Sequence, residues 1–552
     1  MGLSQQLNAL NGRFFILPLL AFFAGIIGHF GFAPYSMQWT TPLAILGLFA
    51  LLHHKGVQTA KSGFIIGLSF GIGLFISGLR WVHVSLDVFG GLPLIVTLLL
   101  MALLAAYLAL YPALASYLLV RFKQKWPLFN VLLFVSAWAI TEYLRGIVLT
   151  GFPWLSLGYS QTQGIFSQAA SVIGTLGLTA VIVTFSTLTF YTVKRHMLSA
   201  ICLIGLAVAM PYLTSQPNLH QQERSVNLAL IQGNIEQSAK WDASAMWPTI
   251  TRYMDLTREQ FDSDVIIWPE AAMPAVEAWV QDYLNLMDSS AAFNDSAIIT
   301  GIIGRTPKSD VSAIEAAKPP TSKNHDYYNA IMTLGNDTDS RSLEGIYQDN
   351  HSNRYYKHQL LPIGEFVPFQ SLLRPLAPLF NLPMSSFTRG DWAQPNLTAR
   401  GFKFAPAICY EIAFGQLVRA NMKSDTDFLL TISNDAWFGE SIGPHQHMEI
   451  AQMRAIELGR PLIRVTNTGV TAIVDHHGKI TQQLPQFKEA VLRTNLQTVS
   501  GETFFYRHGQ TPLVIGLAAL LFLCLLVGHR QNRVNLKISR IKQDYCLPKA
   551  KG

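Results

Sequence analysis

Three short stretches of the chain carry side chains that could act together in acyl transfer. Cys409 follows the apolar run Phe404–Ile408, Glu270 follows the run Asp264–Trp268, and Lys357 lies between them in chain order. Acyl transfer needs a nucleophile, a base that takes its proton, and positive charge where the oxyanion develops. A thiol, a carboxylate whose pKa is raised by burial, and a lysine ammonium can fill these roles. The residue types therefore predict a Glu–Lys–Cys set for acyl transfer through a cysteine.

Cys409 also has a simpler interpretation, as a core cysteine. Of the four cysteines, Cys202 and Cys524 fall in apolar stretches and Cys546 in the basic C-terminal tail, so Cys409 has no disulfide partner nearby. A lone thiol is either buried or used. A position between a strand and a helix would expose the thiol at a sheet edge, near amides that stabilise its thiolate. Isolation alone leaves both interpretations open.

The segments around these residues alternate between strand and helix patterns, which is typical of an α/β domain. Glu270 then stands at the carboxyl edge of a sheet, where such enzymes build sites. Most of the stretch 306–353 is expected to be a surface insertion. The expected strands are Val226–Ile231, Asp264–Trp268, Ala297–Ile303, Ala330–Leu334, Phe404–Cys409, Phe428–Ser433, Leu462–Asn467 and Val470–Asp475, and the expected helices are Ala245–Phe261, Ala275–Met287, Ala413–Met422 and His447–Leu458.

The distribution of charge divides the 552-residue chain into an acidic region and a basic, apolar remainder. Residues 217–505 hold 31 of the 34 acidic side chains and 23 of the 41 lysines and arginines, a net charge of −8. The remainder carries 18 basic and 3 acidic residues, a net +15, although half of all residues in the chain are apolar. A basic, apolar remainder indicates membrane topology and not nucleic-acid binding.

Six apolar runs approach the roughly 20 residues that a bilayer-spanning helix needs, and two are shorter. The longer runs are Phe14–Phe32, Phe64–Trp81, Leu92–Leu110, Leu128–Leu144, Val172–Tyr191 and Leu513–Gly528, and the shorter are Pro42–Leu52 and Leu198–Tyr212. Eight spans place the basic loops and the basic tail on one side, as the positive-inside rule requires. We therefore expect a membrane part at 1–216, an extracytoplasmic domain at 217–505, and a last span with a cytoplasmic tail at 506–552.

Glu142 and Arg145 lie at the outer end of the fifth expected span. Ionisable residues at membrane depth are costly and often functional. Two interpretations stay open: both side chains reach the interface, or they contact a lipid headgroup as part of a substrate site.

Several motifs resemble the carbon–nitrogen hydrolase (nitrilase) superfamily, and most closely its membrane branch, the apolipoprotein N-acyltransferases. In chain order they are Gln232-Gly233-Asn234-Ile235, Lys240-Trp241, Trp268-Pro269-Glu270, Tyr356-Lys357, Pro362-Ile363-Gly364-Glu365, Cys409-Tyr410-Glu411 and Ser433-Asn434-Asp435-Ala436-Trp437-Phe438-Gly439. The resemblance covers nearly the whole chain. It implies an α-helical membrane bundle of about eight spans plus an α/β nitrilase-like domain, an α-β-β-α sandwich.

The resemblance also implies roles. Glu270 would be the general base, Lys357 the oxyanion stabiliser and Cys409 the nucleophile. Glu365, Tyr410 and Glu411 would support these three residues. How the supporting roles are divided between Glu365 and Glu411 stays open. Substrate-contacting or loop positions would be Trp241, Trp437 and Arg460. The apolar stretch Phe366–Leu382 could dip into the interface, act as a lid, or pack on the membrane helices.

The implied reaction is a ping-pong acyl transfer in the bacterial inner membrane. Cys409 would take the sn-1 acyl chain of a phospholipid, with phosphatidylethanolamine as the expected donor. The acceptor would be the α-amino group of the S-diacylglyceryl cysteine of a diacylated apolipoprotein. No cofactor or metal, no nucleic acid and no second copy of the chain are expected, so the enzyme would act as a monomer with a periplasmic catalytic domain and cytoplasmic termini.

Three rivals remain for comparison. A membrane-tethered amidase or nitrilase would use the same Glu–Lys–Cys set on a small amide, but eight spans exceed what a tether needs. A transporter or sensor would be expected to carry more functional charges within its spans. A metal enzyme would rest on His445-Gln446-His447 or His476-His477, neither of which has a familiar zinc-ligand spacing, so surface or packing roles are expected for these histidines.

Overall fold

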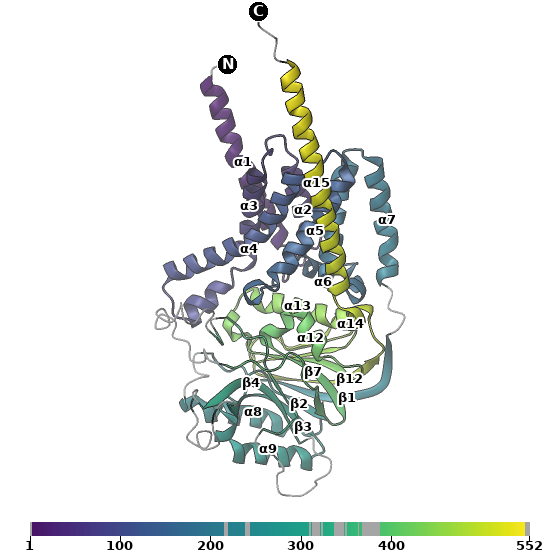
Figure 1. Cartoon of the computed structure of the whole chain (residues 1–552). Helices are drawn as coiled ribbons and strands as arrows, with labels where there is room; N and C mark the ends of the chain where they lie inside the picture. The colour runs from purple at the N-terminus through teal and green to yellow at the C-terminus, as the bar shows by residue number, and fades with distance from the viewer. Residues whose placement is uncertain are drawn as a thin grey trace, which may run out of the picture.

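The chain folds into a bundle of long helices that sits on a layered α/β domain (Figure 1). A computed structural model describes residues 3–214, 219–237, 243–308, 311, 321, 324–335, 347, 350–362, 364–366 and 387–546, with side chains from 15 to 534. The start of the first helix and the end of the last lie at the same end of the bundle, away from the α/β domain (Figure 1).

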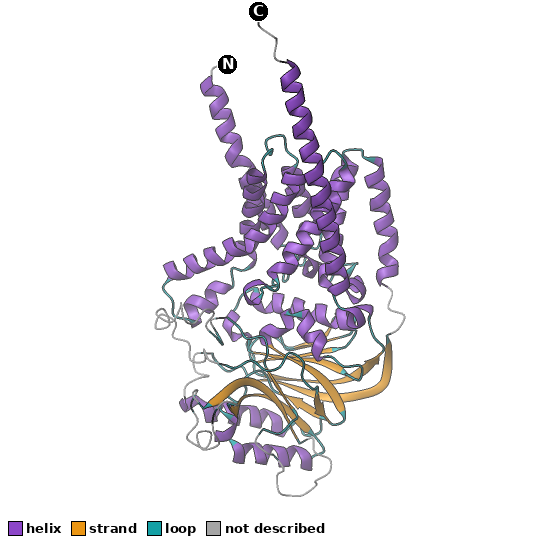
Figure 2. Cartoon of the chain, viewed as in Figure 1, coloured by secondary structure: helices purple, strands orange, loops and turns teal. Residues whose placement is uncertain are grey.

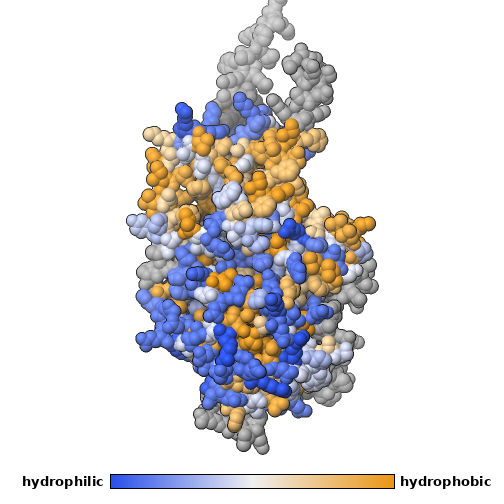
Figure 3. Space-filling view, turned by 180° about the vertical axis from the view of Figure 1, so that it is seen from behind, coloured by the Kyte–Doolittle hydropathy of each residue, from blue (hydrophilic) through white to orange (hydrophobic). Residues whose placement is uncertain are grey.

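Eight apolar helices of the described part of the chain form the bundle. They are α1 (Leu3–His29), α2 (Thr40–Leu52), α3 (Ala60–Gly78), α4 (Leu94–Phe122), α5 (Pro127–Arg145), α6 (Ala170–Val193), α7 (Met197–Thr214) and α15 (Thr511–Cys546). Within the described residues, six of them are long and apolar enough to cross a membrane, while Phe15–His29 and Thr40–Leu52 are shorter. The shorter run Leu198–Tyr212 thus lies in an 18-residue helix, and α2 remains short. Apolar side chains dominate this part of the surface, and polar ones the α/β domain (Figure 3).

Close helix contacts in the bundle depend on small residues. A Cβ atom added at Gly73 of α3 would lie 2.0 Å from the carbonyl oxygen of Phe22 in α1. Only a glycine lets the two backbones approach this closely, as is typical of membrane helix pairs.

In the α/β domain, the described strands form two six-stranded sheets between two layers of helices (Figure 2). The first sheet has the order β12-β1-β2-β3-β4-β5 and the second β11-β10-β9-β8-β7-β6. Their bounds are β1 (His220–Gln232), β2 (Val265–Ile267), β3 (Ala297–Pro307), β4 (His325–Leu334), β5 (Arg354–Tyr356), β6 (Leu397–Ala399), β7 (Phe402–Ile408), β8 (Phe428–Ser433), β9 (Leu462–Thr466), β10 (Ala472–Val474), β11 (Ile480–Gln483) and β12 (Ala490–Ser500). This is the α-β-β-α sandwich that the sequence predicts.

Separate clusters of apolar side chains join the two sheets to each other and each sheet to its helices. Leu228, Ile267 and Ile331 of the first sheet meet Phe404 and Ile432 of the second in one fully buried cluster. On its other face the first sheet packs on α8 (Met246–Arg258) and α9 (Gln281–Phe293). The second sheet is covered by α12 (Gly415–Asn421) and α13 (Gly443–Leu458), which lie between it and the bundle (Figure 1).

The sequence patterns missed four strands and misplaced one helix. The strands β5 and β6 have three residues each, and β11 and β12 carry polar side chains on an exposed face, so no apolar run marks them. The expected helix Ala275–Met287 is wrong at its start. Val276 instead makes a β-bridge with Ile303, a 3₁₀ turn follows at Glu277–Trp279, and the helix begins only at Gln281.

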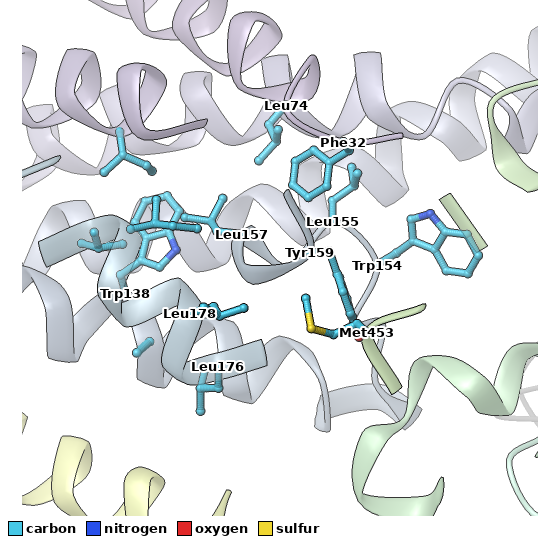
Figure 4. Close-up of a cluster of buried hydrophobic side chains, with 14 of the residues drawn as sticks. Phe32, Leu74, Trp138, Trp154, Leu155, Leu157, Tyr159, Leu176, Leu178 and Met453 are labelled. Carbon is cyan, nitrogen blue, oxygen red and sulfur yellow. The ribbon is translucent and has the colours of Figure 1, made fainter. Parts of the chain in front are cut away.

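Helix α13 joins the two halves of the molecule. All its residues except His445 are buried, and Met453 packs among side chains of the membrane part such as Leu155 and Tyr159 (Figure 4). Gln446 accepts hydrogen bonds from the indoles of Trp81 (3.1 Å) and Trp154 (2.7 Å). Its amide donates to the Gly78 carbonyl at 3.1 Å. Directed hydrogen bonds, as well as apolar contact, therefore fix the domain on the bundle.

Candidate active site

The ends of parallel strands bring the predicted Glu–Lys–Cys residues together. Strands β2 and β5 run in the same direction in the first sheet, so Glu270 and Lys357, which follow them, emerge at one edge. Cys409 follows β7 of the second sheet and opens the 3₁₀ helix η8 (Cys409–Ala413). The facing carboxyl edges of the two sheets thus form the site that the sequence predicts.

Glycine at position 301 lets the Glu270 loop pass. A Cβ atom on Gly301 of β3 would lie 2.7 Å from the amide nitrogen of Ala271 and 3.0 Å from the Cα atom of Glu270. Any side chain there would push the carboxylate away from its partners.

Lys357 lies between two carboxylates. Its Nζ is 2.8 Å from Oε1 of Glu365 and 3.5 Å from Oε1 of Glu270, and it is 1% exposed. The side-chain amide of Asn329, on β4, donates to both carboxylates at 2.8 Å. Burial alone would lower the pKa of Lys357, but Glu365 and Glu270 outweigh it and raise that pKa, so the ammonium stays charged.

Glu270 is held on both oxygens. Oε2 accepts the backbone N–H of Asn434 at 2.8 Å, and Oε1 faces Asn329 and Lys357. The carboxylate therefore links the first sheet to the end of β8 in the second, and its position does not depend on a mobile surface rotamer.

The Cys409 thiol is half-buried and resists ionisation. Burial, followed by the negative charge of Glu270, raises the pKa of the thiol well above its usual range, against the opposing effect of Lys357. At neutral pH the resting group is a thiol, so attack on a carbonyl needs a base beside it.

Glu411 accepts hydrogen bonds from the backbone on both sides of the site. Its Oε1 accepts the Tyr355 hydroxyl and the backbone N–H groups of His358 and Gln359, at 2.7–3.0 Å, and its Oε2 accepts the Ile408 N–H at 2.7 Å. These donors flank Lys357 on one side and Cys409 on the other. Of the two carboxylates whose roles the sequence leaves open, Glu365 contacts the ammonium and Glu411 ties the two backbone segments together.

A loop of the membrane part reaches this site. The hydroxyl of Tyr410 donates to the Gly151 carbonyl at 3.1 Å, and the side chain of Gln359 donates to the Thr150 carbonyl at 3.0 Å. The residue directly after Cys409 and the residue two after Lys357 therefore rest on the segment that follows α5.

Arg145 holds that segment in place. Its guanidinium donates to the carbonyls of Phe152 (2.7 Å) and Trp154 (2.6 Å) and to the Ser156 hydroxyl (3.1 Å). Glu142 accepts from Thr179, Trp138 and the Leu157 N–H. Arg145 is 2% exposed and Glu142 8%, so both side chains are buried and make internal contacts, and a role for them in a substrate site stays a prediction.

We expect Arg145→Met to lower both the midpoint of thermal unfolding and the rate of acylation of Cys409, because two buried carbonyls lose their donors. Arg145→Lys is the matched control. One ammonium cannot satisfy three acceptors in a fork, so it should fail in the same way. If Arg145 instead contacts a lipid headgroup, Arg145→Lys should retain the wild-type rate. Arg145→Met should then need more phospholipid for its half-maximal rate and keep the wild-type unfolding midpoint.

The remaining predicted residues are dispersed. The carbonyl of Trp437 accepts from Ser85 at 2.8 Å and its ring meets Phe89, so it contacts the π-helix η1 (Val84–Phe89) of the membrane part. Arg460 lies at the amino end of β9, away from the carboxyl edge, and donates to three backbone carbonyls. Trp241 lies outside the described residues, as does all of the expected lid segment after Phe366.

Several residues of the site carry no strong signal in the sequence. Asn329 stands in an ordinary strand pattern, and Ser433 and Asp435 belong to a motif in which only Trp437 was singled out. His447, expected to have a surface or packing role, is fully buried and bonds to the backbone of Cys409. The rings of His476 and His477 contact each other near the surface at an interplanar angle of 41°. Within the described part of the chain no three His, Cys, Asp or Glu side chains are grouped to hold a metal ion.

Family models match both parts of the chain. The model described as "Apolipoprotein N-acyltransferase N-terminal domain" matches residues 24–188, and "Carbon-nitrogen hydrolase" matches residues 227–503. Among solved structures, the nitrilase-superfamily protein Nit3 of Saccharomyces cerevisiae is 16% identical, with a TM-score of 0.33, covering 51% of this chain and 93% of its own.

Curated relatives match over almost their full length. The apolipoprotein N-acyltransferase of Shewanella oneidensis is 50% identical over 520 residues, covering 93% of this chain and 96% of the relative. That of Vibrio cholerae is 47% identical over 522 residues, covering 93% of this chain and 98% of the relative. The chain belongs to the apolipoprotein N-acyltransferase family.

Proposed function

We propose that the protein transfers an acyl chain from a phospholipid, through a thioester on Cys409, to the N-terminal amine of a diacylated lipoprotein. The observation that carries this proposal is the cluster of Glu270, Lys357 and Cys409 at the junction with the membrane helices, in a chain of this family. The donor is the sn-1 ester of phosphatidylethanolamine, and the acceptor is the α-amino group of an S-diacylglyceryl cysteine.

In the first half-reaction the Cys409 sulfur attacks the ester carbonyl while Glu270 takes the thiol proton. The oxyanion develops beside the Lys357 ammonium, whose charge the neighbouring carboxylates maintain. Collapse breaks the bond to the glycerol oxygen, which leaves as a lysophospholipid with the proton from Glu270. The acyl chain remains as a thioester.

In the second half-reaction the lipoprotein amine attacks the thioester carbonyl and Glu270 takes a proton from the nitrogen. The oxyanion again faces Lys357, and collapse expels the sulfur, which regains a proton as the amide forms. Thioesters suit this purpose because amines attack them readily. Glu365 and Asn329 maintain the spacing of Glu270 and Lys357 through both steps.

Lipid substrates account for the size of the membrane part. Lifting an acyl chain out of the bilayer costs about 0.8 kcal/mol per methylene, so the site must lie where the chains already are. The basic loops support a bacterial inner-membrane orientation with the domain at 217–505 in the periplasm and the ends of the chain in the cytoplasm.

The test is intact-protein mass spectrometry after incubation with phosphatidylethanolamine, with Cys409→Ala as control. We expect a mass gain of one acyl chain on the wild-type protein, none on the variant, and discharge by a diacylated lipopeptide. No adduct on a protein that still acylates the lipopeptide would contradict the thioester route. An adduct discharged by water alone would instead favour the tethered hydrolase.

A further inference from the structure

The nucleophile occupies an unfavourable backbone conformation that the structure has to maintain. Cys409 has φ = 52°, in the left-handed region that residues with a Cβ rarely adopt. Such a conformation is unfavourable and persists only where surrounding contacts impose it. The question is which contacts hold this peptide.

One directed contact reaches the peptide from α13. Nε2 of His447 lies 3.0 Å from the carbonyl oxygen of Cys409. A carbonyl only accepts, so Nε2 must carry the hydrogen.

The other ring nitrogen shows how this tautomer is fixed. Nδ1 of His447 is 2.9 Å from a guanidinium nitrogen of Arg464, which can only donate, and 3.1 Å from Oδ1 of Asp435. Burial and then the charge of Arg464 lower the pKa of His447, so the ring is neutral and carries a single hydrogen. With that hydrogen on Nε2, Nδ1 accepts from Arg464.

A buried ion pair anchors the histidine in turn. Arg464 and Asp435 are 2.7 Å apart and at most 1% exposed, and Oδ1 of Asp435 also accepts the Ser433 hydroxyl at 2.7 Å. Ser433 also interacts with the Cys409 thiol, whose pKa it lowers against the larger effect of burial. A closed ring of contacts therefore runs from the sulfur through Ser433, Asp435, Arg464 and His447 back to the carbonyl of Cys409.

The membrane part packs on this ring from outside. The indole of Trp154 lies 5.5 Å from the imidazole of His447 and donates to Gln446, the preceding residue on α13. Trp154 belongs to the loop that Arg145 holds. The contacts that dock the α/β domain on the bundle therefore also help to orient the ring of His447.

We infer that His447 is a positioning residue, which holds the Cys409 peptide in its left-handed conformation by donating Nε2–H to the carbonyl, with Arg464, itself anchored by Asp435, fixing the tautomer through its donor to Nδ1. This inference rests on the proposed role of Cys409 as nucleophile. It predicts that the hydrogen at Nε2 matters for acylation, and not the bulk of the ring or its contact with Asp435.

Two amides separate these possibilities. The amide nitrogen of His447→Gln can stand where Nε2 stands and donate to the Cys409 carbonyl. His447→Asn places its amide near Nδ1, keeps a partner for Asp435, and cannot reach the carbonyl. The measurement is the single-turnover rate of thioester formation on the full-length protein with phosphatidylethanolamine vesicles, as a function of lipid concentration, together with the unfolding midpoint of each variant.

We expect His447→Asn to lower the limiting rate about tenfold to thirtyfold, the effect of one lost hydrogen bond on a strained group, with the half-saturating lipid concentration unchanged. His447→Gln should retain the rate within about threefold. Equal losses in both variants, or losses that follow the unfolding midpoint, would overturn the inference. Absence of an adduct on the wild-type protein would instead refute the thioester mechanism itself.

Discussion

Replacing Glu270 by glutamine is expected to slow thioester formation about 10²–10⁴-fold at neutral pH. The side chain keeps its shape and can still accept from Asn329, but it can no longer take the thiol proton. Because burial and neighbouring charge raise the pKa of Cys409, very little thiolate is present without a base. The measurement is the single-turnover rate of acylation by mass spectrometry.

The pH profile gives this prediction a second, independent readout. In Glu270→Gln only the small fraction of free thiolate attacks, so the rate should rise about tenfold for each pH unit while the pH stays below the raised thiol pKa. Glu489→Gln is a matched control, since that carboxylate pairs with Arg252 on the surface helix α8. A Glu270 variant that keeps the wild-type rate at pH 7 would exclude Glu270 as the base.

Residue types that chemistry requires could be predicted from sequence, because strands deliver them to a common edge. Glu270 and Cys409 each follow a short, fully buried apolar run, and such runs predict parallel strands whose ends meet. Long apolar runs predicted most of the bundle, and strands alternating with helices predicted an α/β domain, whereas the α-β-β-α sandwich followed from the resemblance to the nitrilase superfamily. The distribution of charge along the chain predicted the boundaries of the α/β domain and the membrane topology, because the acidic domain and the basic loops differ sharply in composition.

Contacts between distant segments could not be predicted in this way. Asn329 bridges two carboxylates that lie 59 and 36 residues away, and His447 reaches Cys409 from a helix 38 residues further on. Arg145 also shows the limit of an argument from position alone. A cation at the end of a span leaves an interfacial role and a lipid contact open, and position alone could not predict its hydrogen bonds to three groups of the following loop. The local sequence pattern predicts helices and strands. The roles of Asn329, His447 and Arg145 depend instead on how those helices and strands pack against one another.

Lys357→Met is expected to reduce the rate of thioester formation about 10²–10³-fold, the usual effect of removing one group that stabilises an oxyanion. The change also harms the resting protein. Glu270 and Glu365 would remain bridged by Asn329 without the ammonium that neutralises them. Breaking a buried ion pair in this way typically costs about 3–5 kcal/mol, so the unfolding midpoint should fall as well.

The double variant Lys357→Met/Glu365→Gln separates the two effects. Removing one of the two carboxylates relieves the unbalanced charge, while the amide oxygen of the new side chain can still accept from Asn329, so the unfolding midpoint should recover toward the wild-type value. The rate should stay low, because no ammonium faces the developing oxyanion. If rate and midpoint recover together, Lys357 acts by holding the fold and not by stabilising the oxyanion. If only the midpoint recovers, the ammonium at this position acts on the transition state, and the carboxylates around it serve to keep it charged and in place.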